Sequence, residues 1–183
     1  MSLGGNAMVS TTFLNLKTEK QAKIRKALLV EFSNQPLAKA QVAPIVKMAG
    51  IARGAFYKYF DDLADSYRYL YGVAMHDIHA AINQKVSNDS FDPQFYLNQV
   101  ATFVDGVVNS RYQELIKMHL DKNESLIGED RSQPVSELDS RQWAAMILSH
   151  QVIKTILLNP ERKVQTMKRL KEVLELLDGE EMG

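Results

Sequence analysis

Apolar residues recur every three to four positions along most of the chain, a spacing typical of amphipathic α-helices. The clearest stripe is Ile24, Ala27, Leu28 and Phe32, with lysines lying away from it. No segment alternates apolar and polar residues over a useful length, as a half-buried strand would. The pattern therefore predicts an all-α protein of about eight to nine helices. The expected helices cover residues 18–33, 40–49, 52–60, 61–86, 93–109, 112–119, 137–158 and 160–178.

Capping signals mark the starts of several of these helices. Thr18, with Gln21 three residues later, has the form of a capping box. Asp61-Asp62 supplies acidic caps before the long helix that follows, and negative charge favours a helix N-terminus. Asp92-Pro93 is a cap followed by proline at the first helical position. Asn159-Pro160 separates the last two helices.

Residues 41–60, QVAPIVKMAGIARGAFYKYF, predict two short helices joined by a tight turn. Gly50 makes the turn, because glycine adopts the left-handed backbone angles that end a helix. Pro44 fits the first of these helices if that helix starts no earlier than Ala40, since the first turn has N–H groups without helical partners. This is the outline of a helix-turn-helix, whose second helix lies in the major groove of DNA.

The motif is more specific than its outline. The residues in question are Ile45, Ala49-Gly50-Ile51, Gly54, Phe56-Tyr57 and Tyr59-Phe60, within roughly Thr18 to Tyr71. At these spacings the stretch resembles the DNA-binding domain of the TetR family of transcriptional regulators. Gln41 and Ala52 stand near positions where that family usually has a small hydroxyl residue, and Leu63 stands where it usually has a phosphate-binding lysine. The resemblance implies a dimeric repressor that binds a palindromic operator and is released by a small molecule.

Charge divides the chain unequally, although the 183 residues have a net charge of zero. Residues 17–59 carry nine basic and two acidic side chains, a net charge of +7. Residues 1–16 carry none, so the remainder has a net charge of −7. A basic segment is often only a solvated helix face, but here it coincides with the helix-turn-helix. The asymmetry therefore predicts double-stranded DNA as the partner of this end.

The second helix of the motif needs one face in its own core and another on DNA. At about 100° per residue, Phe56 and Phe60 point to the core while Gly54 and Lys58 point the opposite way. Arg53 has the reach for a bidentate guanine contact. The predicted DNA-binding residues are Gln41, Lys47, Ala52, Arg53, Gly54, Ala55, Tyr57, Lys58 and Tyr59.

Alternative interpretations stay open at this point. Tyr59 could be half-buried and brace the head, and Arg53 could be a simple surface charge. The head as a whole could bind a protein, which would make the chain an effector-independent adaptor of TetR-like shape. The departures at Ala52 and Leu63 leave room for this second function.

The last two helices have apolar faces that predict a homodimer through a four-helix bundle. The alternative is that they only complete the core of one chain. Eight methionines and several aromatic residues in the chain suggest a cavity for a small-molecule effector. The candidate ligand-binding residues are Tyr96, Phe103, His119, Trp143, Met146 and His150, with core packing the alternative for each.

Enzyme chemistry is not expected. The chain has no cysteine, which excludes disulfides and thiolate metal sites and suits a cytoplasmic location. His76 and His79 have a spacing that can hold a metal, but no matched carboxylate accompanies them and a surface pair is expected. There is no glycine-rich phosphate loop and no serine in a nucleophile elbow. We therefore expect no catalytic residue, no cofactor, no metal and no membrane span.

The predicted domains are a disordered arm at 1–16, a helix-turn-helix domain at 17–61, and a helical regulatory and dimerisation domain at 62–183. The arm is predicted because this stretch has no charged side chain and no signal-peptide pattern. Inside the third region, residues 121–135 form a polar stretch that predicts an irregular connection.

Overall fold

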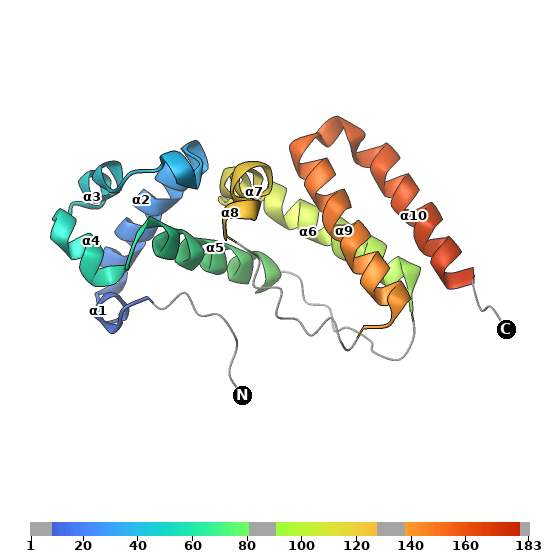
Figure 1. Ribbon diagram of the computed structural model, residues 1–183, viewed down its shortest axis with the longest axis horizontal. Coiled ribbons are helices and arrows are strands. Elements are labelled where there is room, and N and C mark those ends of the chain that lie inside the picture. The colour runs from blue at the N-terminus through green and yellow to red at the C-terminus, as the bar shows by residue number, and fades with distance from the viewer. Residues whose placement is uncertain (1–8, 81–90, 128–137, 180–183) are drawn as a thin grey trace. The chain divides into compact units, whose positions relative to one another are not determined.

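The computed structural model describes residues 9–80, 91–127 and 138–179, and all of their regular elements are helices (Figure 1). The all-α prediction is confirmed. The elements are α1 (Thr11–Leu14), α2 (Thr18–Asn34), the 3-10 turn η1 (Leu37–Lys39), α3 (Val42–Ala49), α4 (Arg53–Tyr59), α5 (Leu63–Ala80), α6 (Pro93–Val108), α7 (Gln113–Met118), the π-helical turn η2 (His119–Asn123), α8 (Glu124–Ile127), α9 (Ser140–Leu158), the 3-10 turn η4 (Pro160–Arg162) and α10 (Lys163–Gly179). Among these helices, none is long and apolar enough to span a bilayer.

The described residues divide into two compact units. The head unit takes residues 9–77 and 111–127, and the three-helix unit takes residues 78–80, 91–110 and 138–179. The head unit is therefore larger than the predicted DNA-binding domain of 17–61, because α5 and a returning segment of later sequence both belong to it. The predicted functional boundary at residue 61 stays a prediction.

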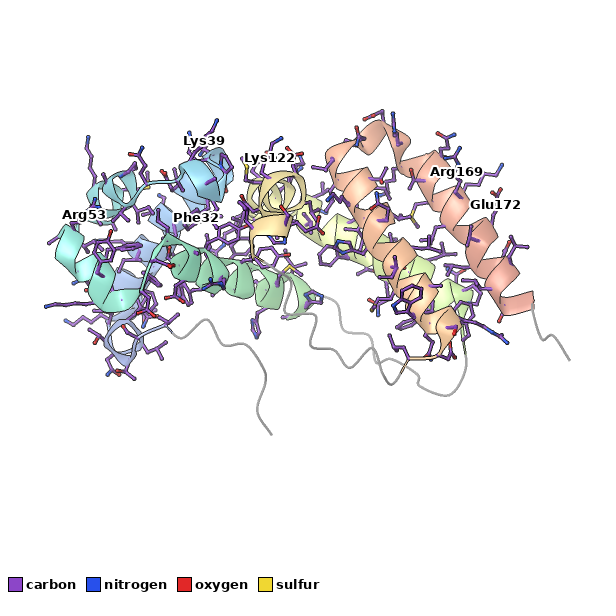
Figure 2. The ribbon with its side chains drawn as sticks, viewed as in Figure 1. Phe32, Lys39, Arg53, Lys122, Arg169 and Glu172 are labelled. Carbon is purple, nitrogen blue, oxygen red and sulfur yellow. The ribbon has the colours of Figure 1, made fainter. Side chains whose placement is uncertain are left out.

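The core of the head unit is built on α2, whose predicted apolar stripe is buried. Ile24, Leu28 and Phe32 are fully buried, and Ala27 is 1% exposed. Phe32, labelled in Figure 2, meets the ring of Tyr67 from α5 edge-on, with centroids 5.1 Å apart. The helix also packs against α3 and α7. Each such buried side chain contributes about 1.5–3 kcal/mol relative to an exposed one.

The predicted capping box at the start of α2 is wrong. Lys17 is the N-cap residue and offers no side-chain cap, while Thr18 is already helical. Gln21 donates its side-chain amide to the carbonyls of Leu14 and Leu16, both at 3.0 Å. The chain before α2 lies within reach of this glutamine, so nearby backbone acceptors take its hydrogen bonds in place of the expected cap.

The prediction of a disordered arm is wrong for residues 9–16. They include α1, which Ser10 caps by accepting a hydrogen bond from the amide of Phe13 at 3.2 Å. Phe13 has no exposed surface. A single buried aromatic residue therefore holds this segment, and a stretch without charge patterning gave no sign of it. Residues 1–8 lie outside the described part of the chain.

The acidic caps are confirmed at two helices. The Asp62 carboxylate accepts from the amide of Asp65 at 2.6 Å, at the start of α5. The Asp92 carboxylate accepts from the amide of Gln94 at 2.9 Å, and Pro93 is the first residue of α6. The predicted extension of the long helix to residue 86 lies outside the described residues.

Residues 111–127 return to the head unit. The short helix predicted at 112–119 is confirmed as α7, but the predicted irregular connection is wrong for residues 121–127, which form η2 and α8. Residues 128–135 lie outside the described part. The difference has a physical cause: Asn123 is polar yet buried, so an apolar-periodicity rule does not count it as inward-facing, and the rule does not expect its polar neighbour His119 to be buried either.

Each of these two buried polar residues, His119 and Asn123, makes a hydrogen bond to another residue of the head unit. The Asn123 side-chain oxygen accepts from the amide of Leu37 at 2.9 Å, just before α3. His119 Nδ1 shares a hydrogen bond of 3.0 Å with the Tyr67 hydroxyl, and its ring stacks on Tyr71 at 4.0 Å. Burial raises the pKa of Tyr67 to about 12, so its hydroxyl stays protonated at neutral pH.

A second polar contact joins α5 to the segment at 111–127. The Tyr112 hydroxyl donates to the Asp77 carboxylate at 2.7 Å, and Arg111 lies 3.4 Å from the same oxygen. The hydrogen bond from Tyr112 is the main reason that the pKa of Asp77 is lowered. Asp77 and Arg111 are the two residues between which the chain leaves the head unit and comes back.

The three-helix unit packs α6, α9 and α10 on one another (Figure 1). Asp139 begins α9 with a complete capping box, and Asn159-Pro160 ends it as predicted. The predicted apolar face of α9 is only partly the buried one: Leu157 is buried, but Trp143 is 47% exposed. The buried residues of α9 are Ala145, Val152, Ile156 and Leu157.

We predict that Asn123→Ala lowers the free energy of unfolding by about 1–3 kcal/mol, because the amide of Leu37 loses its acceptor inside the protein. The measurement is urea denaturation followed by circular dichroism. Ser125→Ala is the matched control, since Ser125 is exposed in the adjoining α8. A loss no larger than that of the control would contradict a structural role for this hydrogen bond.

Candidate nucleic-acid interface

The two helices of the predicted motif are present as α3 and α4. Gln41 is the N-cap of α3 in extended conformation, so Pro44 falls in the first turn as expected. Gly50 ends the helix with φ +65° and ψ +39°, in the left-handed region. The amide of Ile51 then donates to the carbonyl of Val46 at 3.1 Å, which satisfies one of the last carbonyls of α3. The turn predicted from Gly50 is confirmed.

The second helix, α4, has a buried face and an open face. Phe56 has no exposed surface, and Phe60, its C-cap residue, is 2% exposed, so both predicted core positions are confirmed. Their rings lie 5.4 Å apart in a tilted arrangement. Arg53, Gly54, Tyr57 and Lys58 are exposed. Figure 2 shows Arg53 at the edge of the head unit.

Eight of the nine predicted DNA-binding residues have accessible surface. Gln41, Lys47, Ala52, Arg53, Gly54, Tyr57 and Lys58 are exposed, and Ala55 is partly exposed. Tyr59 is the exception, with only 5% of its surface accessible. Its ring packs edge-on against Phe13 at 5.8 Å. Tyr59 is therefore a bracing residue, as in the alternative interpretation, although its partner is the N-terminal segment rather than the regulatory part of the chain.

An open groove of about 620 Å³ brings four elements of the head unit together, η1, α3, α4 and α5. Arg53 and Tyr57 line it from α4, and their side chains approach within 3.3 Å. The other lining residues are Leu37, Gln41, Val42, Ala43, Asp62, Leu63 and Ala64. These include the first two residues of α3 and of α5, so the groove receives two helix N-termini. Of these lining residues, only Gln41, Arg53 and Tyr57 were among the predicted DNA-binding residues. The sequence does not indicate that the start of α3 lies beside the start of α5.

The exposed cations of this surface favour an anion, while a carboxylate lies at the start of each of the two helices. Backbone amides at a helix N-terminus carry partial positive charge, and the Gln41 side chain does not cap α3. Among the ion pairs of the described residues, none involves Lys47, Arg53 or Lys58. Glu31, one of the two acids in residues 17–59, accepts from the amide of Gln41 at 2.8 Å. Asp62 is the acidic residue in the groove lining.

Comparison with solved structures identifies the fold. No protein-family model matches the chain, and no curated protein sequence does. Among the solved structures that match is a TetR family transcriptional regulator from Chloroflexus aurantiacus J-10-FL, with a TM-score of 0.55 and 20% sequence identity. The match covers 93% of this chain and 97% of that one. The chain has the TetR fold. The resemblance drawn from residues 41–60 therefore extends, as a fold, over nearly the whole chain.

The candidate ligand-binding residues are not all in one unit of the TetR fold. His119 belongs to the head unit, is 2% exposed and is engaged with Tyr67 and Tyr71. These contacts favour the core alternative for His119. The other five, Tyr96, Phe103, Trp143, Met146 and His150, lie on α6 and α9 of the three-helix unit. Sequence reasoning missed Ser149 of α9, whose hydroxyl is buried and has no hydrogen-bond partner among the described residues.

The histidine pair on α5 has other contacts. His76 Nδ1 lies 3.7 Å from the Asp77 carboxylate, which is itself engaged by Tyr112. The ring of His79 lies 5.5 Å from that of Phe103. Within residues 9–80, 91–127 and 138–179, no group of three or more His, Asp or Glu side chains could hold a metal ion.

The turn of the motif gives a test that separates backbone strain from crowding. A β-carbon at Gly50 would meet no atom within 4 Å, so the cost of Gly50→Ala comes from the left-handed backbone alone. We expect a loss of about 1–2 kcal/mol in the free energy of unfolding. Gly50→Asn should lose less, because asparagine tolerates this conformation.

Gly54→Ala is the matched control for that measurement by guanidinium denaturation. Gly54 also has open space around its β-carbon, but it lies in helix α4. Alanine there should leave stability unchanged or raise it by up to about 1 kcal/mol. Equal effects at the two glycines would contradict the strain at Gly50.

Proposed function

We propose that this chain is a dimeric, sequence-specific DNA-binding transcriptional regulator, most simply a repressor released by a small-molecule effector. The observation that carries the proposal is the open face of α4: Arg53, Gly54, Tyr57 and Lys58 are exposed together on the second helix of a helix-turn-helix. They stand in a segment of net charge +7 within a TetR fold. Such a face suits the major groove, and the surrounding cations suit the phosphates.

Each exposed residue of α4 has a chemical role in this proposal. Arg53 donates to the O6 and N7 acceptors of a guanine, the commonest specific contact in the major groove. Gly54 has no side chain, so the helix can approach the base edges closely. Lys58 and the Tyr57 hydroxyl bind phosphate oxygens. The backbone amides at the start of α3 and Lys47 near its other end bind DNA phosphates. These contacts fix the position of the head along the duplex.

The three-helix unit has the apolar surface that a dimer needs. Val164 is 83% exposed and Leu176 is 70% exposed, both on α10, while Trp143 and Ile147 of α9 are 47% and 38% exposed. Several large apolar side chains exposed on two adjoining helices suit an interaction site. The same two helices from a second copy complete a four-helix bundle. A two-fold dimer presents two heads to a palindromic operator.

The effector part of the proposal is supported by α6 and α9. Tyr96, Phe103, Met146 and His150 are half-buried on these helices, and Ser149 offers a buried hydroxyl without a partner. An effector that binds one arrangement of the dimer better than the other shifts the population of DNA-binding heads. Its binding and that of DNA are then reciprocally linked.

A second candidate function is favoured by one feature of the groove. Its lining includes Leu37, Val42, Ala43, Leu63 and Ala64, which are apolar, and Leu63 stands where the TetR family usually has lysine. An apolar groove suits the side chains of a protein partner, so an effector-independent adaptor is the alternative. Binding that requires a protein and shows no salt-dependent DNA affinity would favour it.

The function is tested with a duplex selected from a random library by the purified wild-type chain. Its affinity should fall steeply, on the order of 10³-fold or more, between about 50 and 200 mM salt. Arg53→Ala should cost about 1–3 kcal/mol of binding free energy and relax the preference at one base pair. Arg162→Ala, which removes an exposed arginine from η4, is the charge-matched control. Failure to select any duplex at low salt would refute the proposal.

The dimer is tested by Leu176→Glu. Leu176 is 70% exposed in one chain, so the charge does not disturb the fold but would be buried in the bundle. We expect sedimentation velocity to show a monomer for this variant and a dimer for wild type. Leu126→Glu is the matched control, because Leu126 of α8 is 57% exposed and lies in the head unit. A monomeric wild type, or dimers of both variants, would contradict the assignment.

A further inference from the structure

The short N-terminal segment lies at the end of α4 that carries Lys58. This helix has only seven residues and ends with Phe60 in extended conformation. The last carbonyls of a helix have no partner inside it. The amide of Phe60 serves the carbonyl of Phe56 at 3.0 Å. The carbonyls of Lys58 and Tyr59 depend on donors from elsewhere.

Ser10 supplies both of those donors. Its hydroxyl donates to the carbonyl of Lys58 at 2.7 Å, and its amide donates to the carbonyl of Tyr59 at 3.2 Å. The same hydroxyl oxygen accepts from the amide of Phe13 at 3.2 Å. One serine therefore caps the start of α1 and the end of α4 together.

Phe13 ties the same helix end to its neighbours. It is fully buried, and its ring centroid lies 5.2 Å from that of Phe60 and 5.2 Å from that of Tyr69 on α5. Tyr59 adds a third ring at 5.8 Å. The Tyr69 hydroxyl in turn accepts from Arg25 of α2 at 3.3 Å. Phe13 thus joins the end of α4 to α5, and Tyr69 links this cluster to α2.

We propose that residues 10–13, which we call the N-terminal clip, position α4 for reading DNA without touching DNA themselves. The proposal rests on the function proposed above. A helix of two turns does not keep its shape alone, so its orientation is fixed by what holds its two ends. The turn at Gly50 holds the start, near Arg53, and the clip holds the end, at Lys58. Ser10 and Phe13 are positioning residues.

The clip affects specific binding more than general attraction to DNA. Base readout requires side chains to be held within about 0.5 Å of their productive geometry. Phosphate attraction depends on charge and tolerates larger displacements. Loosening the end of α4 therefore weakens binding to a selected sequence, while the head keeps the charge of every lysine and arginine.

A purely stabilising clip would behave differently. Its loss would lower the temperature of unfolding but leave the affinity of the folded protein unchanged. The Ser10–Lys58 hydrogen bond is exposed to solvent, so its loss alone costs little stability. Ser10→Ala also removes the side-chain cap of α1, which lowers the temperature of unfolding. Position is therefore separated from stability by comparing affinities at a temperature where each variant is folded, and Phe13→Leu perturbs the same contact more strongly.

The experiment uses the full chain and two DNA probes: the duplex selected by wild type and the unselected random pool. Ser10→Ala should weaken binding to the selected duplex about fivefold, with binding to the pool and the salt dependence unchanged. Phe13→Leu should weaken it further, while Ser10→Thr keeps the hydroxyl and restores binding. Thr12→Ala is the matched control, because Thr12 is exposed on the same α1. Thermal melts establish that each variant is folded at the binding temperature.

Three results would overturn the inference. If folded Ser10→Ala and Phe13→Leu bind the selected duplex as wild type does, the clip has no positioning role and the DNA-binding function stands. If affinity for both probes falls only in step with the folded fraction, the clip is stabilising and no more. If wild type itself binds neither probe, the proposed function fails and the inference falls with it.

Discussion

Two turns of helix are too few to hold their own shape in water, where about 12–15 residues are needed for even marginal stability. The second helix of the motif, α4, has seven, and its environment supplies what its length does not. Phe56 and Tyr59 anchor its inner side, the left-handed Gly50 sets its start, and Ser10 completes its end. Buried side chains and backbone caps stabilise α4, so its exposed side chains are not needed to keep the helix folded. The exposed face is therefore available to bind a partner.

The same limit explains why the head unit is larger than the motif. Three helices of this size bury little apolar surface, and the unit gains more from α5 and from residues 111–127. Phe32 meets Tyr67 there, and the buried pair of His119 and Tyr67 adds a polar contact in which the donors and acceptors are matched. A buried polar pair of this kind contributes little net free energy, but it allows one arrangement and penalises others.

Local signals in the sequence were enough for much of the fold. Gly50, Asp62 and Asp92 act on backbone groups within a few residues, so their roles could be predicted from neighbours alone. The burial of Phe13 could not be predicted, because its aromatic partners are 46 or more positions later and no nearby residue indicates them. The exposed face of α4 could be predicted from helical periodicity. The groove beside it could not be predicted, because it forms only where the starts of α3 and α5 come together. Trp143 was expected inside and is half-exposed, since periodicity reports an apolar face but not what covers it.

The bond between Asn123 and Leu37 spans 86 positions of sequence. A nascent chain that has emerged only as far as α5 has its helix-turn-helix sequence complete but lacks the acceptor for Leu37 and the α7 residues that cover α2. Closing a loop of that length has an entropic cost that must be met before the contacts form. The contacts that complete the head unit therefore become available only after the sequence of α6 has been synthesised. A fragment cut after residue 77 would carry the exposed side chains of α4 without residues 111–127, which belong to the same compact unit.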